Sequence, residues 1–356
     1  MKLASIERIL EIKDIDGADR IQAARVLGYW TVIKRGEFKV GDLCVFHMPD
    51  TIVDIEKFPE AYSILKEPRL KVIKLRKQVS QGLALPIIKF ASAMPSLAAL
   101  YESLEDKYSE SLNPVIGADV SEFIGIKKYE KPIPECMKGI TKGNFPGFIP
   151  KTDENNLRSY PAILGNLYAE EEVYVTVKID GQSSTYYWHD DKFGVCSRNL
   201  ELVFNENNGF WKNAAKHNIE DALTDYSKIT GKSWALQGES YGPGIQGNKT
   251  GVAELSFAAF ALYNITDAYI ASLDEFWNFC QTYEIPSVYK LEHSGKLEKL
   301  GKNIDELLDK VNGQCYNNGS PAEGLVFRAA RRIPYADLRD LSGKIISEKF
   351  ALKYGE

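Results

Sequence analysis

The stretch Val173-Tyr174-Val175-Thr176-Val177-Lys178-Ile179-Asp180-Gly181 alternates apolar and polar residues with the period of two that is typical of a β-strand. Its four branched aliphatic residues predict a face toward the core, which leaves Lys178 and Asp180 on the opposite face. Gly181 predicts a sharp turn directly after the strand. Because a lysine on a sheet face is usually solvated, this Lys-x-Asp-Gly pattern indicates chemistry only if the rest of the chain supports it.

Polar residues recur at the ends of the strands that follow. Arg198 comes after a predicted strand at residues 193–197, Glu239 ends one at residues 234–239, and Glu323 precedes an apolar strand that runs to residue 328. A basic segment at residues 344–349 closes the series. A lysine nucleophile, cationic side chains and Mg²⁺ held by carboxylates are the parts that phosphoryl transfer to an amine requires. The order of these elements is more specific than any one of them.

The composition is that of an ordinary globular protein. The chain has 356 residues, of which 44% are hydrophobic and 26% charged, and this length allows two domains. No apolar run approaches the roughly 20 residues that a membrane span requires, and the first residues lack a secretory signal, so we expect no membrane association and a cytoplasmic location. Five scattered cysteines argue against a disulfide framework or a zinc site.

Turn and strand signals divide the chain into two domains. Residues 1–130 contain short strands with tight turns, which predict an OB-like β-barrel with a helical insertion at residues 95–108. Residues 131–145 begin with a charged, proline-containing segment and are predicted to be a linker. Residues 146–356 mix strands and helices without a regular βαβ order, so we expect an α+β domain of antiparallel sheets flanked by helices. A capping box from Ser272 to Glu275 opens one helix, and an apolar pattern predicts another at residues 304–311.

A basic cluster in the first domain has two open interpretations. It comprises Arg69, Lys71, Lys74, Arg76 and Lys77. The cluster is either a solvated strand face or a groove for a polynucleotide on a small barrel. Residues 1–130 contain 19 basic and 19 acidic side chains, so the domain as a whole has no positive charge that would favour the second interpretation.

The ordered elements as a set resemble motifs I, Ia, III, IIIa, IV and V of the covalent nucleotidyltransferases, which comprise DNA ligases, RNA ligases and mRNA capping enzymes. The segment Asn144-Phe145-Pro146-Gly147-Phe148-Ile149-Pro150-Lys151-Thr152-Asp153-Glu154 is similar to the lead-in of RNA ligases with an N-terminal OB domain, of the Naegleria and Deinococcus types. This resemblance covers essentially the whole chain.

The resemblance implies an ATP-dependent RNA ligase that joins 3′-OH and 5′-phosphate ends at nicks in duplexes. It implies ATP as the cofactor, with AMP carried covalently on Lys178, together with Mg²⁺ or Mn²⁺. Lysyl-AMP and a 5′-adenylylated polynucleotide would be the intermediates. The partner would be an RNA or RNA/DNA duplex with a nick, and the enzyme would act as a monomer.

The resemblance also implies a role for each motif residue. Lys178 is the expected nucleophile, and Asp180 and Gly181 shape its turn. Arg198 contacts the nucleotide or a 5′-phosphate, Glu239 holds the ribose or a metal, and Glu323 helps to bind metal. Phe260 stacks on adenine, and Lys344 contacts the α-phosphate. Two positions depart from the family pattern. Ala261 stands where motif IIIa has an aspartate, and Ile346 stands where motif V has its second lysine, so Lys349 or Lys353 is expected to take that role.

Two other functions remain possible on the sequence alone. A capping guanylyltransferase shares Lys-x-Asp-Gly but uses GTP, and it places an OB domain after motif V, whereas about a dozen residues follow Lys344 here. A non-catalytic nucleic-acid binding module could retain the barrel with a decayed second domain. The intact Lys178, Glu239 and Glu323 argue against decay.

Overall fold

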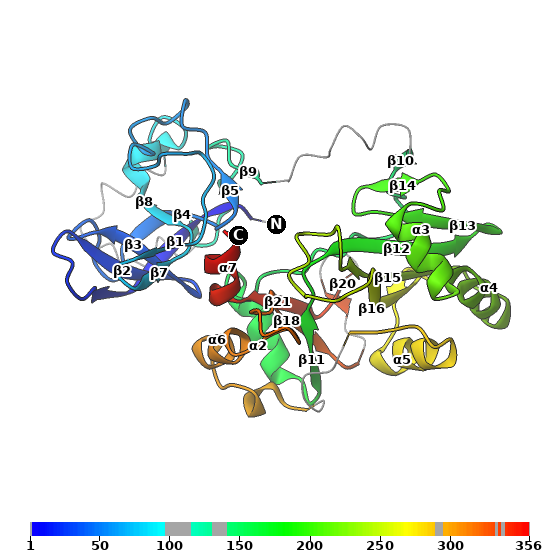
Figure 1. Ribbon diagram of the computed structural model, residues 1–356. Coiled ribbons are helices and arrows are strands. Elements are labelled where there is room, and N and C mark those ends of the chain that lie inside the picture. The colour runs from blue at the N-terminus through cyan, green and yellow to red at the C-terminus, as the bar shows by residue number, and fades with distance from the viewer. Residues whose placement is uncertain are drawn as a thin grey trace. The chain divides into compact units, whose positions relative to one another are not determined.

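The computed structural model describes residues 2–96, 115–129, 141–288, 295–331, 334–335 and 339–355. Almost all of the predicted helical insertion, and residues 131–140 of the predicted linker, lie outside the described residues. The chain forms two compact units (Figure 1): the first comprises Met1–Pro132, Leu157–Pro161 and Glu348–Glu356, and the second comprises Ile133–Asn156 and Ala162–Ser347. Two short segments that the sequence assigned to the second domain therefore belong to the first unit.

The first unit is built on a five-stranded antiparallel sheet with the order β3-β2-β1-β4-β8. Its strands are β1 (Ala4–Asp14), β2 (Ile21–Val26), β3 (Tyr29–Lys34), β4 (Leu43–His47) and β8 (Leu83–Pro86). The long strand β1 pairs with β4 through its first half and with β2 through its second half, and its register shifts between Ile9 and Glu11. Such an irregularity bends a strand, which lets one strand serve two parts of a curled, barrel-like sheet. Separate apolar clusters fill the two sides of this sheet.

Short elements complete the first unit. They are β5 (Thr51–Ile52), β6 (Ile73–Leu75), β7 (Gln78–Ser80), the 3₁₀ helix η1 (Ile87–Phe90), β9 (Lys127–Lys128) and α7 (Glu348–Tyr354). The strand predicted at residues 70–76 is shorter in the structure, because the backbone of Leu70 bonds to Asp50 and Thr51 before β6 begins. β6 and β7 form a two-stranded hairpin of their own.

The second unit contains a seven-stranded antiparallel sheet with the order β10-β14-β13-β12-β15-β16-β17. The strands are β10 (Thr141–Asn144), β12 (Gln182–His189), β13 (Lys192–Cys196), β14 (Leu200–Leu202), β15 (Trp234–Tyr241), β16 (Ser256–Asn264) and β17 (Tyr269–Ile270). Helices α3 (Gly209–Lys216) and α4 (Ile219–Thr230) pack on β12 and β13, and α5 (Leu273–Thr282) packs on β16 (Figure 1). Buried aromatic residues, among them Tyr186, Trp234, Phe257 and Phe279, form the core between sheet and helices.

A separate three-stranded sheet, β11-β18-β21, completes the second unit. Its strands are β11 (Val173–Lys178), β18 (Gly324–Ala329) and β21 (Ser342–Ile346). The elements outside this sheet are α2 (Pro161–Ala169), η4 (Leu297–Lys299), α6 (Ile304–Asn312), β19 (Pro334–Tyr335) and β20 (Arg339–Asp340). The strands pair in antiparallel fashion in both the seven-stranded and the three-stranded sheet of the second unit, which confirms the predicted α+β class. The predicted cap of α5 is also present, since the Ser272 hydroxyl accepts a hydrogen bond from the Glu275 backbone N–H.

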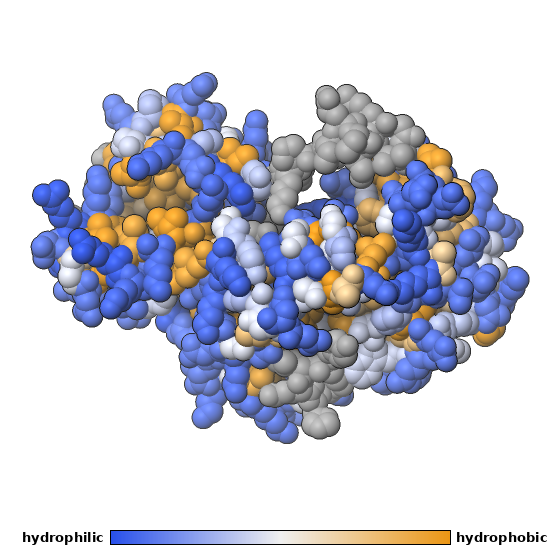
Figure 2. All heavy atoms as spheres, viewed as in Figure 1, coloured by the Kyte–Doolittle hydropathy of each residue, from blue (hydrophilic) through white to orange (hydrophobic). Residues whose placement is uncertain are grey.

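The surface has the character that the composition predicts. On the face drawn in Figure 2, hydrophilic side chains cover most of each unit, with apolar patches between them. Among the described residues, every helix is too short or too polar to span a bilayer.

Candidate functional site

The register of the three-stranded sheet brings the two motif lysines to one face. Thr176 of β11 lies opposite Val326 of β18, which in turn lies opposite Lys344 of β21. Residues directly opposite in an antiparallel sheet share a face, and residues two apart on one strand share it too. Lys178, two residues after Thr176, therefore lies on the same face as Lys344. The backbone register alone thus places both lysines on one surface.

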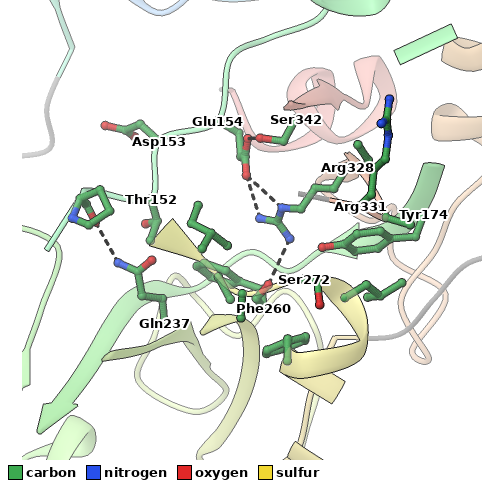
Figure 3. Close-up of a pocket in the computed structure, with 18 of the residues that line it drawn as sticks. Thr152, Asp153, Glu154, Tyr174, Gln237, Phe260, Ser272, Arg328, Arg331 and Ser342 are labelled. Atoms are coloured by element: carbon green, nitrogen blue, oxygen red, sulfur yellow. Dashed lines mark hydrogen bonds and ion pairs between the residues drawn. The ribbon is translucent and has the colours of Figure 1, made fainter. Parts of the chain in front are cut away.

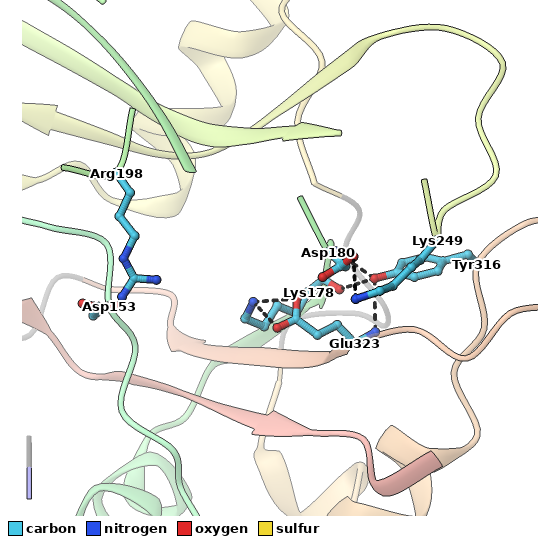
Figure 4. A network of polar contacts seen from close by, with 7 residues as sticks. All are labelled: Asp153, Lys178, Asp180, Arg198, Lys249, Tyr316 and Glu323. Carbon is cyan, nitrogen blue, oxygen red and sulfur yellow. Dashed lines mark hydrogen bonds and ion pairs between the residues drawn. The ribbon is translucent and has the colours of Figure 1, made fainter. Parts of the chain in front are cut away.

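The Lys178 amino group lies between the two carboxylate oxygens of Glu323 (Figure 4). Its Nζ is 2.6 Å from Oε1 and 2.7 Å from Oε2. The two side chains remain 25% and 13% exposed, so the pair is sheltered but reachable from solvent. Burial alone would lower the pKa of Lys178, but Glu323 and Glu239 outweigh it and the pKa is raised. In the ligand-free protein the amine therefore keeps its proton.

Glu239, near the end of β15, faces the same charged groups. Burial raises the pKa of the Glu239 carboxyl to about 8; Lys178 opposes this shift, and Glu323 and Asp180 reinforce it. Gly181 allows this approach: a Cβ there would lie 2.4 Å from the Ser240 carbonyl oxygen and 2.9 Å from Glu239 Cγ. The glycine is thus required by close packing of β15 against the end of the Lys178 motif. A left-handed backbone is not the reason, because Gly181 has no positive φ.

Tyr316 is a site residue that the sequence analysis missed. Its hydroxyl donates a hydrogen bond to the Lys178 carbonyl oxygen (3.1 Å) and accepts from the backbone N–H groups of Asp180 (2.9 Å) and Glu323 (3.1 Å) (Figure 4). Burial raises the pKa of this hydroxyl, so it stays protonated and able to donate. One donor and two acceptor positions exhaust what a tyrosine hydroxyl offers. Tyr316 thereby ties the end of β11 to the residue that precedes β18.

The loop between β15 and β16 supplies a second residue that the sequence analysis missed. Lys249 Nζ lies 3.2 Å from Asp180 Oδ2, and both side chains are largely buried, at 12% and 7% exposed. Gly242 and Gly251 of this loop have φ values of 119° and 71°, and a Cβ at Gly242 would lie 2.6 Å from the Glu254 carbonyl oxygen. This glycine-rich loop therefore carries a cation to the aspartate of the Lys-x-Asp-Gly motif.

Arg198 lies just after β13 and forms an exposed ion pair. Its Nη2 is 2.9 Å from Asp153 Oδ1, and the two side chains are 50% and 38% exposed. The arginine also lowers the pKa of Glu239 slightly against the larger effects that raise it. An exposed guanidinium beside the carboxylates could exchange its aspartate partner for a phosphate, since such surface pairs are worth little.

A pocket opens on the face of the three-stranded sheet that carries Lys178 (Figure 3). Tyr174 lies four residues before Lys178 on the same face of β11 and lines this pocket. The other lining residues include Phe260, Glu154, Gln237 and Arg328. Phe260 reaches the pocket from a bulge, because the register of β15 and β16 shifts around it and leaves it without a cross-strand partner. An aromatic ring with polar groups around it is the lining expected of a site for a planar base.

The polar lining of this pocket is internally paired. Arg328 Nη2 lies 2.7 Å from Glu154 Oε1, and Arg328 Nη1 donates to the Phe260 carbonyl oxygen at 3.3 Å. The Ser342 hydroxyl donates to the other oxygen of Glu154 at 2.6 Å, and Gln237 Nε2 donates to the Pro150 carbonyl oxygen (Figure 3). Ala261, at the position where the family pattern has an aspartate, is buried beside Phe260 and also lines the pocket.

Two candidate lysines belong to the other unit. Lys349 and Lys353 are on α7, which belongs to the first unit, whereas Lys178 and Lys344 are on the sheet of the second unit. The second unit contains the other candidates, on or beside strands of its two sheets: Lys178, Asp180, Gly181, Arg198, Glu239, Glu323, Phe260 and Lys344. The assignment of Lys349 to the site stays a prediction.

The carboxylates offer a partial metal site. Within the described residues, no group of three or more His, Cys, Asp and Glu side chains is arranged to hold a metal ion. Glu239 and Glu323 nevertheless supply two carboxylates that influence the same lysine. Mg²⁺ sites often use one or two protein carboxylates and complete their shell with substrate phosphates and water. This donor set fits a cation that arrives with a nucleotide.

Comparison with known proteins identifies the family. A family model described as RNA ligase matches residues 171–346, and a model of an OB-fold domain matches residues 3–87. No match was found among curated proteins. Solved structures of an RNA ligase from Naegleria gruberi have the same fold over nearly the whole length.

The structure of that ligase with PPi is 31% identical to this chain, with a TM-score of 0.79 and 98% of each chain covered. A variant with AMP and Mn is 32% identical, with a TM-score of 0.80, and a variant with ATP and Mn is 31% identical, with a TM-score of 0.79; each alignment covers 99% of this chain and 98% of the ligase. These matches confirm the predicted fold class. The chain belongs to the RNA ligase family, with an OB-fold domain followed by a nucleotidyltransferase domain.

Proposed function

We propose that this RNA ligase uses ATP and a divalent metal to join a 3′-OH to a 5′-phosphate at nicks in RNA-containing duplexes, with Lys178 as the covalent nucleophile. The observation that supports this most directly is the Lys178 amino group held by both carboxylate oxygens of Glu323, on the strand whose Tyr174 lines the pocket. The Naegleria gruberi structures with ATP, AMP and Mn support the same choice of cofactors.

In the first step, the lysine nitrogen would attack the α-phosphorus of ATP. A P–N bond would form as the P–O bond to pyrophosphate breaks, pyrophosphate would leave with the electron pair of that bond, and the proton of the amine would pass to solvent. The attacking amine must be neutral, whereas Glu323 and Glu239 favour the charged form in the ligand-free protein. A divalent cation held by these two carboxylates would supply compensating positive charge for both the triphosphate and the site.

The pocket beside Tyr174 and Phe260 would receive the base. Phe260 lies at a bulge that presents its ring to the cavity, which is a suitable geometry for stacking on adenine. Lys344 shares the face of Lys178, so it would contact the α-phosphate. AMP would then pass to the 5′-phosphate end, where Arg198 is the exposed cation available to bind it, and the 3′-OH would displace AMP.

The experiment that tests this proposal measures covalent labelling of the purified protein. The protein is first treated with pyrophosphate to remove any resident AMP, and is then incubated with Mg²⁺ and α-labelled ATP or GTP. We expect acid-labile label from ATP, its loss in Lys178→Ala, and its retention in the control Lys142→Ala, whose lysine forms an ion pair with Glu201 on the other sheet of the same unit.

Each other outcome would count against the proposal. Label from GTP alone would indicate a capping-type guanylyltransferase. Label that persists in Lys178→Ala would place the covalent bond on another residue, and the absence of label from either nucleotide would favour a non-catalytic binding module.

A further inference from the structure

The β6–β7 hairpin of the first unit has an unusual turn. Five consecutive residues, 73–77, are exposed, and the two at the tip, Arg76 and Lys77, have φ values of 49° and 69°. Two left-handed residues at a two-residue hairpin loop are normally Asn-Gly or a similar pair, because other side chains are strained there. Strained backbone of this kind is found preferentially where side chains have a function.

The base of the hairpin is firmly attached, in contrast to its tip. The Val32 backbone N–H of β3 donates to the Ser80 hydroxyl of β7 at 2.9 Å, and the Gln81 N–H donates to the Trp30 carbonyl oxygen at 2.9 Å. Lys13 Nζ lies 3.8 Å from the centre of the Trp30 ring, which places a further cation beside this base. The hairpin therefore presents its tip to solvent from a fixed support.

The structure separates the basic cluster of residues 69–77 into two parts. Arg69 is bound to Asp50 at 2.7 Å and stacks on Tyr129, and Lys71 is bound to Glu67 at 2.9 Å. The remaining three are those of the hairpin, namely Lys74, Arg76 and Lys77. Within the described residues none of these three has an ion pair or hydrogen bond through its side chain.

We propose that the β6–β7 hairpin binds the phosphate backbone of the RNA substrate through Lys74, Arg76 and Lys77. This inference rests on the proposed RNA ligase function, because a chain with a net charge of −5 must bind a polyanion through local positive charge. Three cations within four residues match the close spacing of phosphates along one strand. The exposed side chains of Ile73 and Leu75 offer apolar surface to the adjoining sugars and bases.

The turn itself suggests a variant that removes the charge without harming the fold. The triple variant Lys74→Gln, Arg76→Asn, Lys77→Gly places the favoured Asn-Gly pair at the tip, so we expect the hairpin to be at least as stable as in the natural chain. A matched control, Lys192→Gln, Lys212→Gln, Lys228→Gln, removes three exposed lysines from the second unit and changes the net charge equally.

The measurement is the affinity of each full-length protein for a 5′-phosphorylated nicked RNA duplex, without ATP and in EDTA, at several salt concentrations. We expect the hairpin variant to bind about 10- to 100-fold more weakly at low salt, and the slope of log affinity against log salt to fall by about 2 to 3, with little change in the control. Equal affinity and slope in the hairpin variant and the natural chain would overturn the inference. An equal loss in the control would overturn it too, since the effect would then be one of net charge.

Lysine labelling by ATP, a step that involves no RNA, separates this inference from the proposed function. Failure of labelling in the natural chain would refute the proposed chemistry while RNA affinity still tests the hairpin. Normal labelling with no difference in RNA affinity between the hairpin variant and the natural chain would refute the hairpin alone.

Discussion

In the first unit, a buried histidine and a buried tyrosine form a closed pair, whereas in the second unit a lysine and a glutamate form an open one. His47 Nε2 lies 2.9 Å from the Tyr62 hydroxyl and Nδ1 lies 3.1 Å from the Leu83 carbonyl oxygen, with both side chains fully buried. Burial lowers the pKa of His47 to about 4, so this pair is neutral. Lys178 keeps its charge, and both Lys178 and Glu323 keep part of their exposure.

The difference in charge and exposure shows how two hydrogen-bonded polar pairs can have different roles, one structural and one functional. A neutral pair that is buried away from solvent cannot be reached by a ligand. It can only stabilise the fold and favour one packing arrangement of the core. A charged pair at a strand end has a free-energy cost of desolvation although it is not fully buried. A ligand with complementary charges can therefore replace either partner. The predictions below test whether the open pair is reactive and the closed pair structural.

The largest effect is expected from Glu323→Gln, which keeps the size of the side chain but removes its charge. Lysine labelling by ATP should fall about 100-fold, because both the partner of Lys178 and a proposed metal ligand are lost. The control is Glu201→Gln, whose glutamate forms an ion pair with Lys142 in the same unit. Initial labelling rates at saturating Mg²⁺ measure both. A rate in Glu323→Gln within about twofold of the natural chain would mean that this pair is only structural.

A smaller effect is expected from Tyr316→Phe, which deletes the hydroxyl shared by Lys178, Asp180 and Glu323. We expect kcat for lysine labelling to fall about tenfold with KM for ATP unchanged, since the nucleophile is misplaced while the base pocket is intact. Stability should fall by about 1–3 kcal/mol, because three backbone groups lose their partner.

Tyr186→Phe is the matched control for this effect, because the Tyr186 hydroxyl is buried and donates to the Phe210 carbonyl oxygen at 3.1 Å within the core. It should lower stability and leave kcat unchanged. If both variants slow labelling equally, Tyr316 acts through general stability and has no positioning role.

The smallest effect concerns His47 and the pH dependence of stability. The folded pKa of about 4 lies below the unfolded value near 6.5, so the unfolded chain binds the proton first as pH falls. The contribution of His47 is complete above pH 6.5 and is lost progressively toward pH 4. Between pH 7.5 and pH 6 this amounts to about 0.7 kcal/mol.

Urea unfolding of the natural chain and of His47→Gln at these two pH values measures the contribution of His47. The variant should lose less stability than the natural chain over this interval. An identical loss in both proteins would show that other groups account for it.

Local patterns predicted those parts of the fold whose signal lies within a few residues. The alternation that predicts β11 and the Ser272 cap that opens α5 are both of this kind. Helix α4 was missed although Ile219, Ala222 and Leu223 recur at helical spacing, so its signal was present in the sequence. The strand at residues 70–76 was predicted too long, because residues 70–72 have the alternation of a strand but the Leu70 backbone bonds to Asp50 and Thr51 in a neighbouring segment.

The candidate site divides in the same way. The order of motif residues predicted that Lys178 and Glu323 act together, and the structure brings them within 2.6 Å. Tyr316 could not be found from the sequence, because its hydroxyl bonds to backbone groups 136 and 138 residues away and no local pattern marks it. Lys349 was proposed from the resemblance to motif V, and its role stays a prediction, because it lies on α7 of the first unit and no local pattern could indicate that the chain leaves the second unit after Ser347.

The chain passes from one unit to the other four times, at residues 132, 156, 161 and 347. Leu157, Arg158 and Phe350 are buried within the first unit, and Arg158 donates to the Gly28 carbonyl oxygen at 2.6 Å and pairs with Glu348. A gene fragment that begins after residue 132 would leave these side chains without a core. The OB-fold unit is therefore not a detachable module: recombination at a single boundary cannot exchange it, and a swap would have to carry all three of its segments together.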